Sequence, residues 1–84
     1  MFQIEYTKGA RKDLGRLDQA IKDRIGAAID ALGLEPHPPG SRKMVGSEAL
    51  YRVRVGNYRV IYEIQNKILT VFIIKIGHRK DIHC

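Results

Sequence analysis

The chain has 84 residues, enough for one small domain, and we expect residues 1–84 to form that single domain. Fifteen Lys and Arg residues against nine Asp and Glu residues give a formal charge of +6, and the whole excess lies in residues 42–84, which indicates a surface for a polyanion such as nucleic acid. The single cysteine, Cys84, excludes an internal disulfide framework, and the longest apolar stretch, 68–76, is too short to span a membrane, so we expect a cytoplasmic protein without a membrane partner.

The N-terminal half predicts a strand followed by two helices. Residues 2–6 alternate between apolar and polar, as in a strand, and Thr7 can cap a helix whose apolar side chains recur at helical spacing. Asp18 can cap a second helix. We expect Gly33 at the C-terminal capping position of that helix, because Pro36 prevents its continuation. The two helices then form an antiparallel hairpin.

The C-terminal half predicts an antiparallel sheet. A short strand is expected at 42–45, and the alternating runs 50–55 and 58–64 flank a Gly-Asn dipeptide that favours a two-residue hairpin turn. The run 68–76 is apolar on both faces, which is typical of an interior strand. The order β-α-α-β-β-β-β predicts an α+β fold, in which the helices cover the apolar face of an antiparallel sheet of three to four strands.

The predicted hairpin gathers arginines on one face of that sheet. With the turn at Gly56, Arg54 lies opposite Arg59, and Arg52 shares their face because side chains alternate along a strand. Like charges placed opposite each other destabilise a hairpin, so the pattern favours a bound anion at this face. Guanidinium groups match the geometry of phosphate, which indicates a phosphate-rich ligand.

The residue types argue against metal-dependent chemistry on that ligand. The basic half holds only three carboxylates, and the three histidines have no spacing typical of a metal site, so we expect no metal and no cofactor. RNA can instead be cleaved by attack of its own 2′-hydroxyl, which requires charge stabilisation and groups that exchange protons near neutral pH. Histidine suits the second requirement. The tail after the last strand carries Arg79 and His83, and we expect it to bring both near Arg54 and Arg59.

One long motif resembles a known family. The segment L-Y-R-V-R-V-G-N-Y-R-V-I-Y at 50–62, followed by G-H-R-K-D-I at 77–82, is similar to the RelE branch of the RelE/ParE toxin superfamily, and the likeness extends over essentially the whole chain. The resemblance implies a toxin of a type II toxin–antitoxin system. It implies a ribosome-dependent, metal-independent endoribonuclease that cuts mRNA in the ribosomal A site. It also implies a cognate antitoxin protein as a partner, besides the ribosome and mRNA.

The resemblance also assigns roles by position. Arg59 matches the arginine that contacts the scissile phosphate, Arg79 matches the second catalytic arginine, and His83 stands where the family often has a tyrosine. We therefore expect these three residues to be catalytic. The expected RNA-binding residues are Lys43, Arg52, Arg54 and Lys80.

Two other functions are compatible with the sequence. A ParE-like toxin shares the fold but inhibits DNA gyrase by binding and needs no nuclease site. The combination of Arg59, Arg79 and His83 argues against that function. The third possibility is an inactive protein that binds RNA or an antitoxin. Assays of gyrase supercoiling and of mRNA cleavage distinguish the three.

Overall fold

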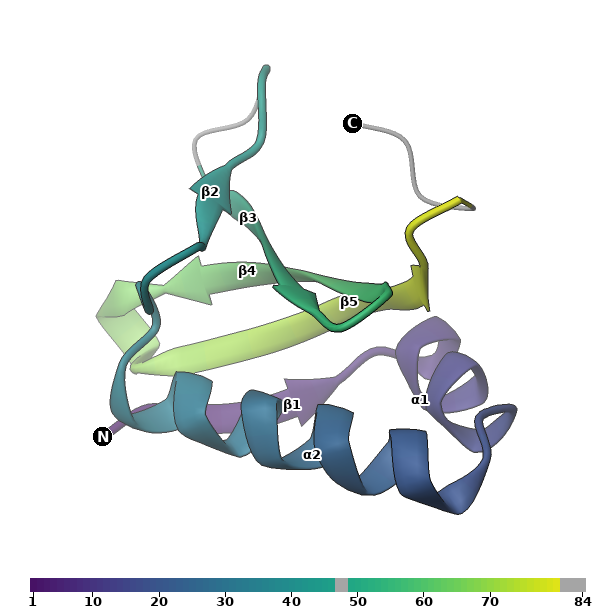
Figure 1. The fold of residues 1–84 in the computed structure, drawn as a ribbon. Helices are drawn as coiled ribbons and strands as arrows, with labels where there is room; N and C mark the ends of the chain where they lie inside the picture. Colours follow the sequence, from purple (N-terminus) through teal and green to yellow (C-terminus); the bar gives the residue numbers. More distant parts are fainter. Residues whose placement is uncertain (47–48, 81–84) are drawn as a thin grey trace.

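A computed structural model describes residues 1–46 and 49–80 (Figure 1). The elements in chain order are β1 (Gln3–Tyr6), α1 (Lys8–Gly15), α2 (Gln19–Leu34), β2 (Arg42–Lys43), β3 (Leu50–Val55), β4 (Tyr58–Gln65), the short 3₁₀ helix η1 (Asn66–Ile68) and β5 (Thr70–His78). This order confirms the predicted N-terminal strand, helical hairpin and antiparallel sheet. Both helices lie on one side of the sheet (Figure 1). Within the described ranges, no helix is long and apolar enough to cross a membrane.

The strands form a single five-stranded sheet in the order β1-β5-β4-β3-β2. The sequence patterns do not predict the place of β1, which pairs in parallel with β5 so that Gln3 lies opposite Thr70. The other neighbouring strands are antiparallel. Flanked by β1 and β4, β5 is the interior strand that its apolar sequence predicts. It begins at Thr70, because Leu69 adopts a left-handed conformation with a φ angle of 47° and ends η1.

The hairpin between β3 and β4 forms in the predicted register, with Val55 opposite Tyr58. Gly56 has a φ angle of 61°, whereas Asn57 is not among the described residues with positive φ. A positive φ at the first central position alone is the geometry of a type II′ turn, which suits the right-handed twist of the flanking strands. Glycine is therefore required at position 56, and the asparagine is not.

The predicted helix N-termini are confirmed. The Thr7 hydroxyl accepts a hydrogen bond from the backbone N–H of Ala10, and the Asp18 carboxylate accepts one from Ile21, each at 3.1 Å. The prediction for Gly33 is wrong: α2 continues to Leu34. Gly33 is buried where α2 meets β1, and an added Cβ would lie 3.0 Å from the carbonyl oxygen of Phe2. The close approach of the two backbones, and not helix termination, explains the glycine.

The hydrophobic core lies between the helices and the sheet. Tyr62 is its largest fully buried side chain, and its hydroxyl donates a hydrogen bond to the carbonyl of Pro36 at 2.8 Å. Burial, the largest cause, raises the pKa of the Tyr62 hydroxyl above its ordinary value. The remaining buried core residues are Ala10, Ile25, Ile29, Leu32, Val60, Ile64, Val71, Ile73 and Ile76.

Helix α1 holds the last part of β5 in place. The pairing of β1 with β5 ends at Tyr6 and Ile73, and beyond that point no strand of the described residues covers the outer edge of β5. There the Thr7 hydroxyl donates to the carbonyl of Ile74 at 3.1 Å, and the Asp13 carboxylate accepts from the N–H of Ile76 at 3.0 Å. These two side chains satisfy edge groups that a neighbouring strand would otherwise bind.

Candidate functional site

Four arginines lie together on the face of the sheet opposite the helices. Arg54 lies opposite Arg59, as the hairpin pattern predicts. Strand β2 adds Arg42, which lies opposite Arg52. Cross-strand partners share a face of a sheet, and the neighbouring positions in β4, such as Val60, point into the core. The surface called the arginine face below consists of Arg42, Arg52, Arg54 and Arg59.

The arginine face is hollowed. All four arginines, with Gly40 and Val53, line a cavity of about 300 Å³. Three neighbouring strands supply the arginines, so four positively charged residues line one cavity. Planar guanidinium groups bind phosphate through paired hydrogen bonds. The cavity therefore suits a phosphodiester backbone.

The side chains of the arginine face rest on an apolar base. Ile61 lies between Arg52 on β3 and Lys75 on β5 in the register, and it is only 8% exposed although it faces away from the helices. The aliphatic stems of such neighbours can cover an apolar side chain while the charged ends stay in water. Arg54 is further oriented by its Nε, which donates to the carbonyl of Gly56 at 2.8 Å. An apolar base lowers the local dielectric and strengthens the attraction to a phosphate.

The nearest carboxylate along β4 does not lie within the cavity. Glu63 lies opposite Phe72, two positions beyond Ile61, and its Oε1 accepts a hydrogen bond from Gln65 Nε2 at 2.6 Å. In the part of the chain that the structure describes, no group of three His, Cys, Asp or Glu side chains could hold a metal ion. The arginine face can bind a phosphate and stabilise negative charge that develops on it. Proton transfer needs a group from elsewhere.

The tail meets the arginine hairpin through its backbone. Gly77 lies opposite Arg59, and the N–H of Arg79 donates to the carbonyl of Asn57, in the hairpin turn, at 2.8 Å. The structure thus brings the start of the tail to the end of the hairpin that carries Arg54 and Arg59. Lys80 is exposed beside Arg79. The third residue expected to be catalytic, His83, lies outside the described residues.

Sequence reasoning did not include Arg42 and placed Lys43 with the RNA-binding arginines. The structure pairs Lys43 with Tyr51, so alternation along β2 puts Lys43 and Arg42 on opposite faces of the sheet. The pairing of Arg42 with Arg52 identifies Arg42 as a residue of the arginine face. A strand of two residues has no alternation from which that register can be predicted.

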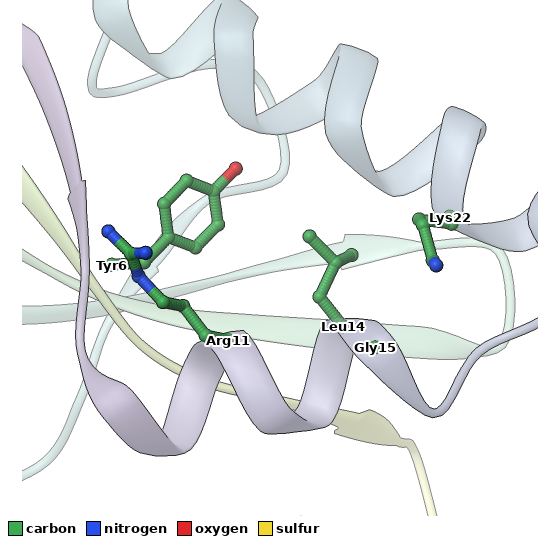
Figure 2. Close-up of a pocket in the computed structure, with 5 residues that line it drawn as sticks. All are labelled: Tyr6, Arg11, Leu14, Gly15 and Lys22. Atoms are coloured by element: carbon green, nitrogen blue, oxygen red, sulfur yellow. The ribbon is translucent and has the colours of Figure 1, made fainter.

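A larger cavity of about 440 Å³ lies on the other side of the sheet, between the helices (Figure 2). In Figure 2 Leu14 points from α1 toward α2, Lys22 points back from α2, and the Tyr6 ring stands beside Arg11. Burial, and secondarily the charge of Asp30, raises the pKa of the Tyr6 hydroxyl. Among its described lining residues Arg11 and Lys22 are the cations, whereas four arginines line the cavity of the arginine face.

Comparison with known proteins assigns the chain to a family. Residues 4–83 match the family described as the ParE toxin of the type II toxin-antitoxin system, parDE. The chain belongs to this family. Toxin RelG of Mycobacterium tuberculosis (strain ATCC 25618 / H37Rv) is 31% identical over 86 residues, which cover 98% of this chain and 95% of the relative. The protein is therefore a toxin of a type II toxin–antitoxin system, within the RelE branch of the superfamily.

Solved structures agree with this placement. A chain of the archaeal RelE–RelB complex from Pyrococcus horikoshii OT3 superposes on the toxin with a TM-score of 0.83 and 31% identity, over 96% of this chain and 98% of that one. A chain of the RelBE2 toxin–antitoxin complex from Mycobacterium tuberculosis gives a TM-score of 0.82 and 26% identity, over 93% and 98%. The fold predicted from the sequence is confirmed.

Proposed function

We propose that this toxin is an endoribonuclease that depends on the ribosome and cuts mRNA in the A site without a metal ion. The observation that carries the proposal is the cavity lined by Arg42, Arg52, Arg54 and Arg59. Positively charged grooves of this kind bind the phosphodiester backbone of single-stranded nucleic acids. The toxin would then act as one domain in the cytoplasm, where translating ribosomes present the messenger.

The proposed reaction is attack of a ribose 2′-hydroxyl on the adjacent phosphate, leaving a 2′,3′-cyclic phosphate and a free 5′-hydroxyl. Arg59 stabilises the charge that builds on the phosphate, and Arg79 assists from the tail. His83 is proposed as the group that exchanges the proton. Arg42 joins Arg52, Arg54 and Lys80 as a proposed RNA-binding residue, and Lys43, which lies on the other face of β2, is proposed to contribute less. One arginine that stabilises a transition state is typically worth about 10²–10³-fold in rate.

A cognate antitoxin is the proposed protein partner. The solved relatives from Pyrococcus horikoshii and Mycobacterium tuberculosis are complexes of a toxin with an antitoxin. The arginine face attracts an acidic segment, and charge complementarity makes association fast and sensitive to salt. We propose that such a segment covers Arg52, Arg54 and Arg59 and so blocks access to RNA.

Inhibition of DNA gyrase is the second candidate function. The matched family carries the ParE description, and ParE-like toxins share this fold. An arginine-lined cavity also attracts acidic protein surfaces, so the fold alone does not separate the two activities. A supercoiling assay with purified gyrase gives the direct test.

The experiment is primer extension on a defined mRNA in a translating extract, with the toxin added at known concentration. We expect new 3′ ends within codons for the wild type and a loss of about 10²–10³-fold in their rate of appearance for Arg59→Ala. Lys67→Ala removes one positive charge from η1, at the opposite end of the β4–β5 hairpin, and is the matched control with unchanged cleavage. Intact mRNA together with inhibited supercoiling would favour the gyrase function instead.

A further inference from the structure

We propose that a cavity at the end of β5, on the side of α1, binds one nucleotide of the RNA that crosses the arginine face. This proposal rests on the proposed ribonuclease function. The cavity measures about 390 Å³, and its walls include Arg16, Leu17, Tyr58, Lys75, Gly77 and His78. It is called the β5-end cavity below.

The β5-end cavity is adjacent to the arginine face. Gly77 lies opposite Arg59 and Lys75 lies opposite Ile61, so both lie by register on the same side of the sheet as the arginine face, and both also line the cavity. The pairing of β1 stops at Ile73, and within residues 1–46 and 49–80 no strand covers this edge of β5 beyond that point. A nucleic acid strand held by Arg59 can therefore reach the cavity around that edge, past Gly77.

The inner part of the cavity suits a nucleobase. The rings of Tyr58 and His78 lie edge to face, with centroids 5.4 Å apart and an interplanar angle of 76°. The Nδ1 atom of His78 accepts a hydrogen bond from the backbone N–H of Lys80 at 3.2 Å, which fixes the ring beside the tail. Leu17 adds an apolar wall. Aromatic rings stack on any base, so the contact would be tolerant of sequence.

The charges of the cavity suit the remainder of a nucleotide. Arg16 and Lys75 are exposed cations on its walls, placed to contact the phosphate. Asp13 also lines the cavity, but its Oδ2 already accepts the N–H of Ile76 at 3.0 Å. A carboxylate repels phosphate and accepts hydrogen bonds from the amino groups of bases. The arrangement therefore orients the ligand, with its base near Asp13 and its phosphate at the exposed cations.

The first test measures cleavage of mRNA on programmed ribosomes in single-turnover kinetics, as a function of toxin concentration. For the double variant Arg16→Ala/Lys75→Ala we expect the half-saturating concentration to rise about tenfold, with the maximal rate kept within about twofold, because binding and not chemistry is affected. The control, Lys22→Ala/Lys67→Ala, removes the same charge away from the cavity and is expected to change the half-saturating concentration little. The proposal would be overturned if both double variants raised the half-saturating concentration equally, or if Arg16→Ala/Lys75→Ala did not raise it.

The second test does not require cleavage, so it separates failure of the subsite from failure of the proposed function. The Arg59→Ala toxin is bound to ribosomes carrying mRNA with 4-thiouridine near the A site and is then irradiated. We expect crosslinked peptides that contain Tyr58 or His78, and their loss in Arg16→Ala/Lys75→Ala. Crosslinks of these peptides to ribosomal RNA alone would overturn the assignment to the messenger, and their absence would overturn the subsite. If the wild-type toxin does not cut the mRNA but still forms these crosslinks, the nuclease function is refuted and the nucleotide-binding cavity is supported.

Discussion

The carboxylate of Asp13 accepts a hydrogen bond from the backbone N–H of Ile76 at 3.0 Å, and this contact ties α1 to the strand that leads into the tail. The residue after Ile76 is Gly77, the cross-strand partner of Arg59. Asp13 therefore sets the position of the strand end from which Arg79 reaches the hairpin. Toward Arg59 and Arg79 it acts through the backbone, as a positioning residue.

Replacing Asp13 tests this role. In Asp13→Ala the N–H of Ile76 loses its acceptor, and we expect a loss of about 1–3 kcal/mol in the free energy of unfolding together with slower mRNA cleavage. Asp13→Asn keeps a side-chain oxygen and is expected to restore most of both. Asp18→Ala removes a similar carboxylate contact, the cap of α2, and is expected to lower stability but not the cleavage rate. Full cleavage by folded Asp13→Ala would contradict the positioning role.

Arg42 and Lys43 form a matched pair on opposite faces of β2. Arg42→Ala removes a charge from the cavity, so we expect weaker binding to the mRNA-programmed ribosome and a smaller dependence of binding on salt. Lys43→Ala removes an equal charge from the other face and is expected to have the smaller effect. Equilibrium binding at several salt concentrations gives the comparison. A larger effect for Lys43→Ala would show that the resemblance to the family places this contact better than the sheet register does.

Gly33 and Gly26 lie in the same helix but in different surroundings. A methyl group at Gly33 would lie 3.0 Å from the carbonyl oxygen of Phe2, while nothing lies within 4 Å of one at Gly26. We expect Gly33→Ala to destabilise the fold by about 1–3 kcal/mol because β1 must shift. Gly26→Ala is expected to stabilise it by up to about 1 kcal/mol, because alanine favours the helix. Chemical denaturation measures both, and equal effects would contradict the close approach of α2 and β1.

The raised pKa of Tyr62 predicts how the free energy of unfolding changes at alkaline pH. Burial raises its pKa above the ordinary value of 10.0, so the unfolded chain releases this proton at a lower pH than the folded chain does. The protonated Tyr62 hydroxyl therefore contributes to the free energy of unfolding. This contribution is fully present below pH 10 and is lost as the pH rises through the pKa of the folded state. Tyr62→Phe also loses the hydrogen bond to Pro36, so we expect about 1 kcal/mol less stability at neutral pH but a shallower alkaline decline. The Tyr62→Phe variant is still expected to lose some stability at alkaline pH, because the pKa of Tyr6 is raised as well. Parallel declines in denaturation measured between pH 8 and 11 would contradict the assignment.

Local patterns predict much of this fold because they act over a few residues. The Gly-Asn dipeptide and its alternating flanks were sufficient to place Arg54 opposite Arg59, and the side chains of Thr7 and Asp18 mark the helix starts. The parallel pairing of Gln3 with Thr70 joins distant parts of the chain, and no local spacing encodes it. Gly33 shows the same limit, because its close neighbour is Phe2, just before β1, whereas the helix sequence alone predicts a cap.

The candidate site follows the same division. Arg52, Arg54 and Arg59 were predictable because one hairpin carries all three. Arg42 lines the cavity because the two-residue strand β2 pairs it with Arg52, and this register could not be predicted from the sequence. The contact of Asp13 on α1 with β5 depends on tertiary packing. The roles proposed for Arg79 and His83 rest on the resemblance to RelE toxins, while their place in the tail predicts only that they lie near the hairpin.

The most direct test of the account uses a messenger with a single 2′-deoxynucleotide at the cleaved position, placed in the A site of a programmed ribosome. Attack by the 2′-hydroxyl is the proposed chemistry, so we expect no cleavage of this messenger and normal cleavage of its all-ribose counterpart, whose upstream product ends in a 2′,3′-cyclic phosphate. Binding of the toxin to the two complexes is expected to be equal, which separates chemistry from recognition. Cleavage of the 2′-deoxy messenger at the same position and rate would contradict the central claim.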